Sequence, residues 1–375
     1  MEFGISFDLC HTIDIFVLRK NCLLYFLLFF MMYSNLLGQE KSVPEDSLRS
    51  TYIREFPDYF YLKFLSVSRL LNLELTNRLN NDIALEFAPN LIGYTGFGGL
   101  IMGVGFEVSF KSGESNPQNE ERFGTTKVFD FQTNLYGRKF GLDFAFQNYK
   151  GFYLENPGIY DSDWAPGDVH PQRSDLEVKN RNLAFIRIFN DEKYSFRSSY
   201  NQAEQQLKSA GSFLLTGFIN IGSLSADSSL IPDSARALFG INSDLRSASA
   251  TTFGILPGYS HTFVFFNFYL NLSLSVGPAI QWRTFELEEF SKRNIGLQGA
   301  TTTRIALGYN NNRFFTGFTF VFQNTNSTIE NVQIKSTSGN IKFSLGYRFG
   351  EFGFLRKNVT DILPIPWMRP TEQQP

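Results

Sequence analysis

Few side chains in this sequence combine the type and the spacing that catalysis requires. His170 has Asp168, Ser174 and Asp175 close by in the chain, and such residues could supply a base, an orienting carboxylate and a nucleophile. Closeness in sequence is not geometry, however, and Asp, Ser, Pro and Gly are ordinary turn formers in a polar segment like this one. The chain has three histidines, without the paired spacing that holds a metal. We therefore predict no catalytic residue, no metal site and no cofactor.

Glycines are concentrated between residues 96 and 105, where they superficially suggest a phosphate-binding loop. Their spacing does not match G-x-G-x-x-G, and an alternating, strand-like pattern surrounds them rather than a strand–helix junction. We expect glycine here to let a strand bend or to make room for a bulky neighbour.

The most informative polar residues are charged, and the two signs separate along the chain. We predict that five acidic and five basic side chains line the interior of a barrel. These are Glu74, Glu86, Glu107, Asp130 and Asp143 in the first part, and Arg197, Arg283, Arg304, Lys342 and Arg348 in the second. The two sets would face each other across the lumen. They would form either a salt-bridged interior that fills a narrow barrel or a field across a pore that orients polar solutes.

Amphipathic strands must position these charges. Between 267 and 285, apolar residues such as Leu270, Leu272 and Leu274 take the even positions, and polar residues such as Asn271 and Ser273 take most of the odd ones. A strand changes face at every residue, so one face is apolar and the other polar. The segment is longer than an ordinary globular strand and suits a tilted strand that crosses a bilayer. The same alternation recurs at 100–110, 127–136, 140–149, 314–324 and 339–349.

The connections predict the topology. Short turns fall near 137–139, 190–192, 266–267 and 310–312, and long polar segments fall near 111–126, 150–180, 223–249, 286–299 and 326–338. Outer-membrane barrels have short periplasmic turns and long outer loops. Treating 193–222 as one strand with a bulge near 210–211 places all the short turns on one side. We predict an all-β fold: a single transmembrane antiparallel up-and-down β-barrel over 69–349, with about 12 strands, or 14 if 58–66 also enters the wall.

The two ends and the composition agree with export. Arg19 and Lys20 precede an apolar run that ends at Leu37, which predicts a cleaved signal peptide over 1–38, with a start codon called too early. Residues 39–68 are expected to be a periplasmic lead-in, and 350–375 a Pro-rich periplasmic tail. The two cysteines both fall in the leader, so no disulfide framework is expected beyond it. A net charge of -2 provides no basic field for nucleic acid.

Several short motifs occur in an order that resembles a known family. They are Tyr149-Lys150-Gly151-Phe152-Tyr153, Arg173-Ser174-Asp175-Leu176, Tyr194-Ser195-Phe196-Arg197, Lys208-Ser209-Ala210-Gly211-Ser212-Phe213, Ser229-Leu230-Ile231-Pro232 and Ala306-Leu307-Gly308-Tyr309-Asn310. Together the motifs resemble the family catalogued as domain of unknown function 4421, found in Bacteroidota-type bacteria. The resemblance implies an exported outer-membrane protein without an assigned activity, and it supplies no catalytic residues.

We predict a non-enzymatic protein of the outer membrane, exported through a cleaved signal peptide and acting as a narrow, porin-like channel or as a structural envelope protein. Its partners would be outer-membrane lipids, the barrel-assembly machinery during insertion and, if it conducts, small polar solutes. Two alternatives remain. An outer-membrane lipid-modifying enzyme would need a Ser/His pair at the wall, and a soluble periplasmic β-protein would pack the 42 phenylalanines into a core.

Overall fold

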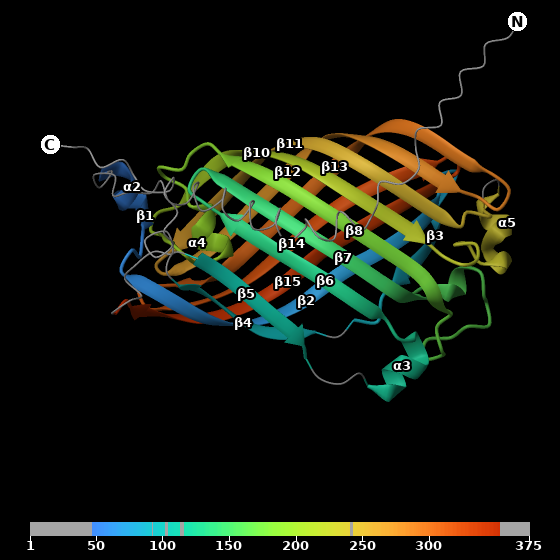
Figure 1. Ribbon diagram of the computed structural model, residues 1–375, viewed down its shortest axis with the longest axis horizontal. Helices are drawn as coiled ribbons and strands as arrows, with labels where there is room; N and C mark the ends of the chain where they lie inside the picture. Colours follow the sequence, from blue (N-terminus) through green and yellow to red (C-terminus); the bar gives the residue numbers. More distant parts are fainter. Residues whose placement is uncertain (1–46, 92, 102–103, 113–115, 241–242, 353–375) are drawn as a thin grey trace, which may run out of the picture. The chain divides into compact units, whose positions relative to one another are not determined.

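The computed structural model describes residues 47–352 apart from 92, 102–103, 113–115 and 241–242 (Figure 1). The predicted signal peptide and the Pro-rich tail from residue 353 onward lie outside the described residues. Within the described part, thirteen strands form one antiparallel sheet that closes on itself as a barrel. The alternating segments of the sequence are therefore wall strands, as predicted. No helix in this part of the chain is long and apolar enough to cross a membrane.

Ten of the strands make the closed ring. They are β2 (Tyr59–Asn77), β3 (Asn80–Ala88), β7 (Phe140–Leu154), β8 (Gln172–Ile188), β10 (Ala210–Ser225), β11 (Ser247–Phe265), β12 (Phe268–Glu286), β13 (Ser291–Asn310), β14 (Phe314–Ile329) and β15 (Val332–Gly350). The ring closes because the last strand, β15, pairs with β2 along its whole length. Residues 59–68, predicted to be lead-in, are the first part of β2.

Three further strands extend the wall without completing the ring: β4 (Tyr94–Ile101), β5 (Val104–Lys111) and β6 (Lys127–Tyr136). β4 follows β3 along the same edge of β2, because β3 pairs with residues 73–77 and β4 with 61–67. β5 pairs with β4, and β6 pairs with β7. The predicted count of 12 or 14 strands therefore differs from a ring of ten plus three. One reason is that the alternating segment 100–110 is divided between two strands, because β4 ends at Ile101 and β5 begins at Val104.

The segment between β8 and β10 does not belong to the wall. It contains α4 (Phe196–Tyr200) and β9 (Gln205–Gln206), and most of residues 191–206 are buried. β9 pairs with β1 (Ile53–Arg54), which follows α2 (Ser47–Tyr52). We call residues 190–209 the plug and 47–54 the clasp. The prediction of one bulged strand over 193–222 is wrong. The wall strand β10 begins only at Ala210, and the alternating residues Tyr194, Phe196 and Tyr200 before it pack against other lumen residues.

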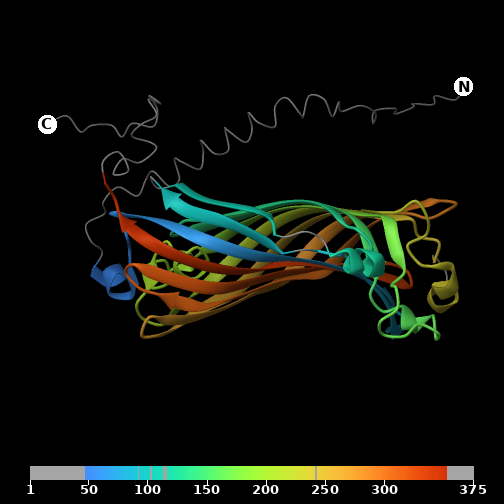
Figure 2. The ribbon, with the colours of Figure 1, turned by 90° about the horizontal axis from the view of Figure 1, so that it is seen from below.

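The connections differ in length at the two ends of the barrel (Figures 1 and 2). At the turn end, tight turns near 137–139, 266–267 and 311–313 link the strands, as predicted. At the loop end, long segments carry α3 (Pro117–Phe123), η1 (Pro157–Ile159), η2 (Asp233–Ala235) and α5 (Arg236–Phe239). The prediction of long loops at 286–299 and 326–338 is wrong. Strands continue through most of both, because Ser, Thr and Asn there pair in register as strand residues.

Burial alternates along the strands in the sense that the sequence predicts. On β12, Leu270, Leu272 and Leu274 are 39%, 44% and 52% exposed on the outside, whereas Asn271 and Ser273 are buried inside. Aromatic residues are concentrated near the turn end of this outer face. Those exposed there are Phe189, Phe265, Phe266, Phe268, Phe314, Tyr347 and Phe349. The phenylalanine rows therefore face outward and do not meet in a central core.

Candidate functional site

The plug fills the lumen at the turn end with aromatic rings. Phe196 lies between Tyr136 of the wall and Tyr200 of the same helix, with ring centroids 4.9 and 4.5 Å away. The hydroxyl of Tyr200 donates to Asn271 Oδ1 at 2.6 Å, and the hydroxyls of Tyr194 and Ser260 are also 2.6 Å apart. The polar inner faces of β11 and β12 therefore hold the plug by hydrogen bonds, as buried tyrosines require.

An ion pair crosses the lumen directly beside the plug. Arg304 Nη2 lies 2.5 Å from Asp143 Oδ2, and the arginine side chain is 1% exposed. Asp143 is on β7 and Arg304 on β13. Between them the ring has β8, β10, β11 and β12 on one side and β3, β2, β15 and β14 on the other. The pair thus joins diametrically opposite strands. Tyr136 and Asn134 each donate to Asp143 Oδ1 at 2.7 Å, which satisfies the second carboxylate oxygen.

Glu107, Asp130 and Lys342 also lie on the inner face. Glu107 Oε1 is 2.7 Å from Lys63 Nζ and 3.0 Å from Lys342 Nζ. Asp130 Oδ2 is 3.7 Å from Arg69 Nε and accepts from Gln147 Nε2 at 3.0 Å. These charges therefore meet cationic partners within the lumen, as a salt-bridged interior requires.

The prediction for Glu74 and Glu86 is wrong. These two residues pair in register on the outer face of β2 and β3, where Glu74 Oε1 lies 2.7 Å from Lys335 Nζ. The inner positions on the same strands belong to buried leucine and phenylalanine residues, namely Leu73, Leu75, Leu85 and Phe87. Near the loop end the arrangement of the rest of the wall is inverted, because an apolar cluster fills the interior and charged side chains take outer positions.

The remaining basic residues have separate surroundings. Arg283 Nη1 donates to the Thr328 carbonyl at 3.2 Å. Arg197 belongs to the plug and not to the wall, because it lies in α4. Arg348 is fully buried and donates to Asn310 Oδ1 at 2.9 Å, with the Phe56 ring centroid 4.0 Å from its guanidinium carbon.

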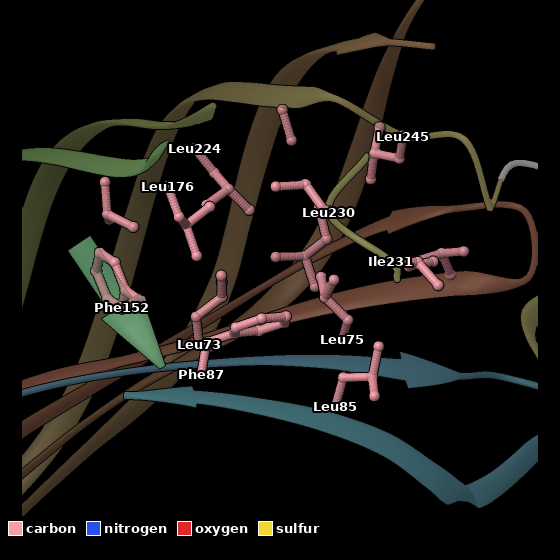
Figure 3. Close-up of a cluster of buried hydrophobic side chains, with 14 of the residues drawn as sticks. Leu73, Leu75, Leu85, Phe87, Phe152, Leu176, Leu224, Leu230, Ile231 and Leu245 are labelled. Carbon is pink, nitrogen blue, oxygen red and sulfur yellow. The ribbon is translucent and has the colours of Figure 1, made fainter. Parts of the chain in front are cut away.

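An apolar cluster closes the loop end (Figure 3). The segment between β10 and β11 turns inward, and five of its side chains pack against leucines and phenylalanines of the wall. We call these five the cap; they are Leu230, Ile231, Ala235, Phe239 and Leu245. Arg173 Nη1 donates to the Ser229 carbonyl at 2.8 Å and so ties the segment to β8.

A chamber of about 100 Å³, lined by both polar and apolar side chains, lies between the cap and the plug. Amide and hydroxyl side chains dominate its polar lining, including Asn180, Asn182, Asn220, Gln281 and Gln323, and Lys179 is the one charged residue among those that line it. Asn220 Nδ2 donates to Asn180 Oδ1 at 2.5 Å. The chamber can therefore hydrogen-bond small neutral molecules while it offers little charge.

The sequence matches a family model over most of its length. The model, described as Domain of unknown function (DUF4421), matches residues 44–349. The chain belongs to this family. The family resemblance of the ordered motifs is thus confirmed. In this DUF4421 protein, one of those motifs, residues 194–197, lies in the plug, and another, 229–232, supplies part of the cap.

Solved outer-membrane proteins are similar to this DUF4421 protein in fold. The outer membrane protease OmpT from Escherichia coli is 8% identical, covers 78% of this chain and 97% of its own, and has a TM-score of 0.39. The translocator domain of autotransporter NalP from Neisseria meningitidis is 6% identical, with coverages of 88% and 98% and a TM-score of 0.30. Ail, the attachment invasion locus protein of Yersinia pestis, is 8% identical, with coverages of 78% and 99% and a TM-score of 0.21. No curated protein matches the sequence.

The catalytic candidates His170 and Asp175 have other partners in this DUF4421 protein. His170 is buried, its Nδ1 lies 2.8 Å from the Leu154 carbonyl oxygen, and the rings of Phe123, Tyr153 and Trp164 surround it. Asp175 binds Arg173 through both carboxylate oxygens at 2.9 Å. Within the described part of the chain, no three His, Cys, Asp or Glu side chains gather as a metal site would require.

Sequence reasoning missed the residues that fasten the plug. Arg49 of the clasp lies 3.0 Å from Glu204 in the plug, and Arg197 lies 3.2 Å from the same carboxylate oxygen. The backbone pairing of β1 with β9 adds to this contact. No local pattern marks Arg49 and Glu204 as partners, since 155 positions separate them. The wall residues Lys63 and Arg69 could have been found by extending the odd-position alternation of β2 back from Leu71.

The ionised form of Glu204 holds the clasp to the plug, so we expect this contact to weaken in acid. Burial alone would raise the pKa of this carboxyl, but the neighbouring guanidinium groups and the Ser195 hydroxyl outweigh it, so the pKa lies below its ordinary value. The resulting stability is complete above the pKa of an unfolded glutamate, about 4.3. It is lost as the pH falls through the lower folded value.

Glu204→Gln should therefore lower the free energy of unfolding by about 1–3 kcal/mol at neutral pH, because the buried arginines lose their counter-charge. The difference from the wild type should shrink as the pH falls below about 4. Urea titrations of the variant and the wild type at neutral pH and at a pH below about 4 measure this difference. Glu288→Gln, at an exposed pair with Arg246, is the control and should change little. An equal loss at both pH values would contradict a role for the Glu204 charge.

Proposed function

We propose that this protein is a non-enzymatic β-barrel of the outer membrane and a narrow channel that is closed in this conformation. The observation that carries the proposal is a chamber with hydrogen-bonding side chains, which lies in the lumen between two separate obstructions, the cap and the plug. A barrel with a purely mechanical role has no need of a hydrogen-bonding compartment in its middle. A conduit for small polar solutes needs one, because the solute must exchange water for wall groups as it passes.

The outer surface supports placement in a bilayer. A soluble protein rarely exposes contiguous apolar surface on the scale of the rows on β10 to β13. Aromatic residues near the turn end match the belts that anchor barrels at a membrane interface. We place the turn end in the periplasm. Outer-membrane lipids would contact the exposed apolar rows of the wall, and the barrel-assembly machinery would be the partner during insertion.

Conductance across a planar bilayer tests the channel, and the two closures predict a non-additive result. Replacing residues 192–207 of the plug with a short Gly/Ser linker should leave the current near baseline, because the cap still closes the loop end. Replacing 229–240 alone should also leave it near baseline, because the plug remains. The double replacement should raise the current at least about tenfold, because both obstructions are gone. The single replacements serve as controls for leakage caused by misfolding.

The alternative is a structural envelope protein, and the ion pair of Asp143 with Arg304 favours it, since a salt bridge across the lumen braces the wall. A double replacement that inserts and shifts on unboiled gels, yet carries no current, would support this alternative and would contradict the channel. We assign no catalytic role, because aromatic rings and a backbone carbonyl surround the His170 ring.

A further inference from the structure

Among the described strands, the wall has a seam between β5 and β6. β5 pairs with β4, β6 pairs with β7, and among the described residues no backbone pair joins β5 to β6. Figures 1 and 2 show the β4–β5 hairpin standing apart from β6. In hydrocarbon, unpaired backbone groups cost several kcal/mol each, which is why membrane barrels close their edges. If the seam persists within the membrane, a polar molecule must pair with the free backbone groups, or a functional benefit must offset their free-energy cost.

A row of charges lies on the lumen side of this seam. Lys63 on β2, Gly98 on β4 and Glu107 on β5 are in register. The ion pair of Lys63 with Glu107 spans β4 because Gly98 has no side chain. A Cβ at Gly98 would approach Glu107 Cγ to 3.0 Å and Lys63 Cε to 3.1 Å. The expectation that glycine in this strand leaves room for a bulky neighbour is thus confirmed at Gly98.

Exposure along this row is uneven. The Glu107 side chain is 36% exposed although it faces inward, whereas the Lys63 and Lys342 side chains beside it are 2% and 13% exposed. Asn134, which points inward from β6 to bind Asp143, is likewise exposed. Solvent therefore reaches the row at Glu107, the carboxylate that Lys63 and Lys342 share.

The surroundings of the seam are amphipathic. On its inner side, three cations (Lys63, Arg69 and Lys342) meet two carboxylates (Glu107 and Asp130), which leaves a net charge of +1. On its outer side, apolar residues of both flanking strands are exposed, namely Phe106, Val108, Phe110, Phe129 and Phe131. A ligand that satisfies both sides has an anionic head and an apolar tail.

We propose that the seam between β5 and β6 is a lateral portal that binds a single-chain anionic amphiphile from the membrane. Its carboxylate or phosphate head lies at Lys63 and Lys342, and its tail lies among the phenylalanines of β5 and β6. Two lysines that share one exposed carboxylate retain donors for a second anion. The portal is separate from the axial route through the plug and the cap, so it can bind whether or not the barrel conducts.

Binding of cis-parinarate, a fluorescent fatty acid, to the full chain in nanodiscs tests the portal. The wild type should bind it saturably above empty nanodiscs, and the methyl ester should bind much more weakly because it carries no charge. Lys63→Gln with Lys342→Gln should raise the Kd at least about tenfold, because the head loses its cations. Lys335→Gln is the matched control, since that lysine lies on the outer face of β15 beside Glu74.

The double lysine variant leaves Glu107 without a partner and could fold poorly. A triple variant that adds Glu107→Gln removes the whole charge group and should lose parinarate binding equally. Absence of saturable binding by the wild type would overturn the proposal. Parinarate binding that the lysine variants leave unchanged would also overturn it. So would a dimer that forms along β5 and binds no parinarate. Because the readout is binding, a failed conductance experiment would leave this result unaffected.

Discussion

Replacing Arg304 with methionine should lower the free energy of unfolding of this barrel by about 3–5 kcal/mol, the cost of removing one partner from a buried ion pair. Asp143 would keep its hydrogen bonds from Tyr136 and Asn134, but its charge would remain in an interior closed by the plug. Methionine approximates the length of the aliphatic part of arginine, so the loss of packing should be the smaller effect. Urea unfolding of the barrel in detergent or lipid measures the change.

The double variant Asp143→Asn with Arg304→Met is the matched control. Asparagine keeps an oxygen that can accept from Tyr136, and no unpaired charge remains, so most of the loss should be recovered. If Arg304→Met alone costs under about 1 kcal/mol, the lumen beside the plug is hydrated and the pair is no brace. That result would also weaken the conclusion that the plug seals the turn end.

The sequence could predict the wall because a wall strand is a local pattern. Leu270, Leu272 and Leu274 face outward for the same reason that Asn271 and Ser273 face inward, and two-residue periodicity records that division directly. The tight turns at 137–139 and 266–267 are equally local. Placement of Asp143 and Arg304 inside followed from the same alternation. Their contact did not, because it depends on which strands lie opposite each other in a closed ring.

The rest of the site depends on contacts that no local pattern contains. Tyr194, Phe196 and Tyr200 show the spacing of a strand, yet they pack in the lumen against Tyr136 and the inner face of the wall. Alternation alone cannot distinguish an aromatic residue that faces lipid from one that faces another aromatic residue. Glu74 illustrates the opposite error. It belongs to the polar set of an alternating strand, yet it faces outward, because the wall there surrounds an apolar interior. The seam between β5 and β6 could not be predicted either, because the sequences of these two strands are ordinary and do not show which edges are unpaired.

The outward direction of the apolar rows supports placement in the outer membrane, so a charge in the belt should have a large effect. Leu274 is 52% exposed in the middle of β12, between other outward-facing apolar residues. Leu274→Arg should lower the free energy of unfolding from lipid by about 2–4 kcal/mol, the cost of an arginine at the bilayer midplane of a barrel. Folding into vesicles, followed by the mobility shift of unboiled samples against urea concentration, measures this cost.

Phe290→Arg provides the comparison that makes the result specific. Phe290 is 54% exposed, much like Leu274, but it lies in the turn between β12 and β13 at the loop end. An arginine there would lie in water or among lipid headgroups, so its cost should be near 0–1 kcal/mol. If the outer face meets lipid, Leu274→Arg should therefore cost clearly more stability than Phe290→Arg, although the two sites are about equally exposed. If the barrel is soluble, the two costs should be alike. Equal and small losses at both positions would mean that the outer face of β12 meets water, and the membrane placement would then be wrong.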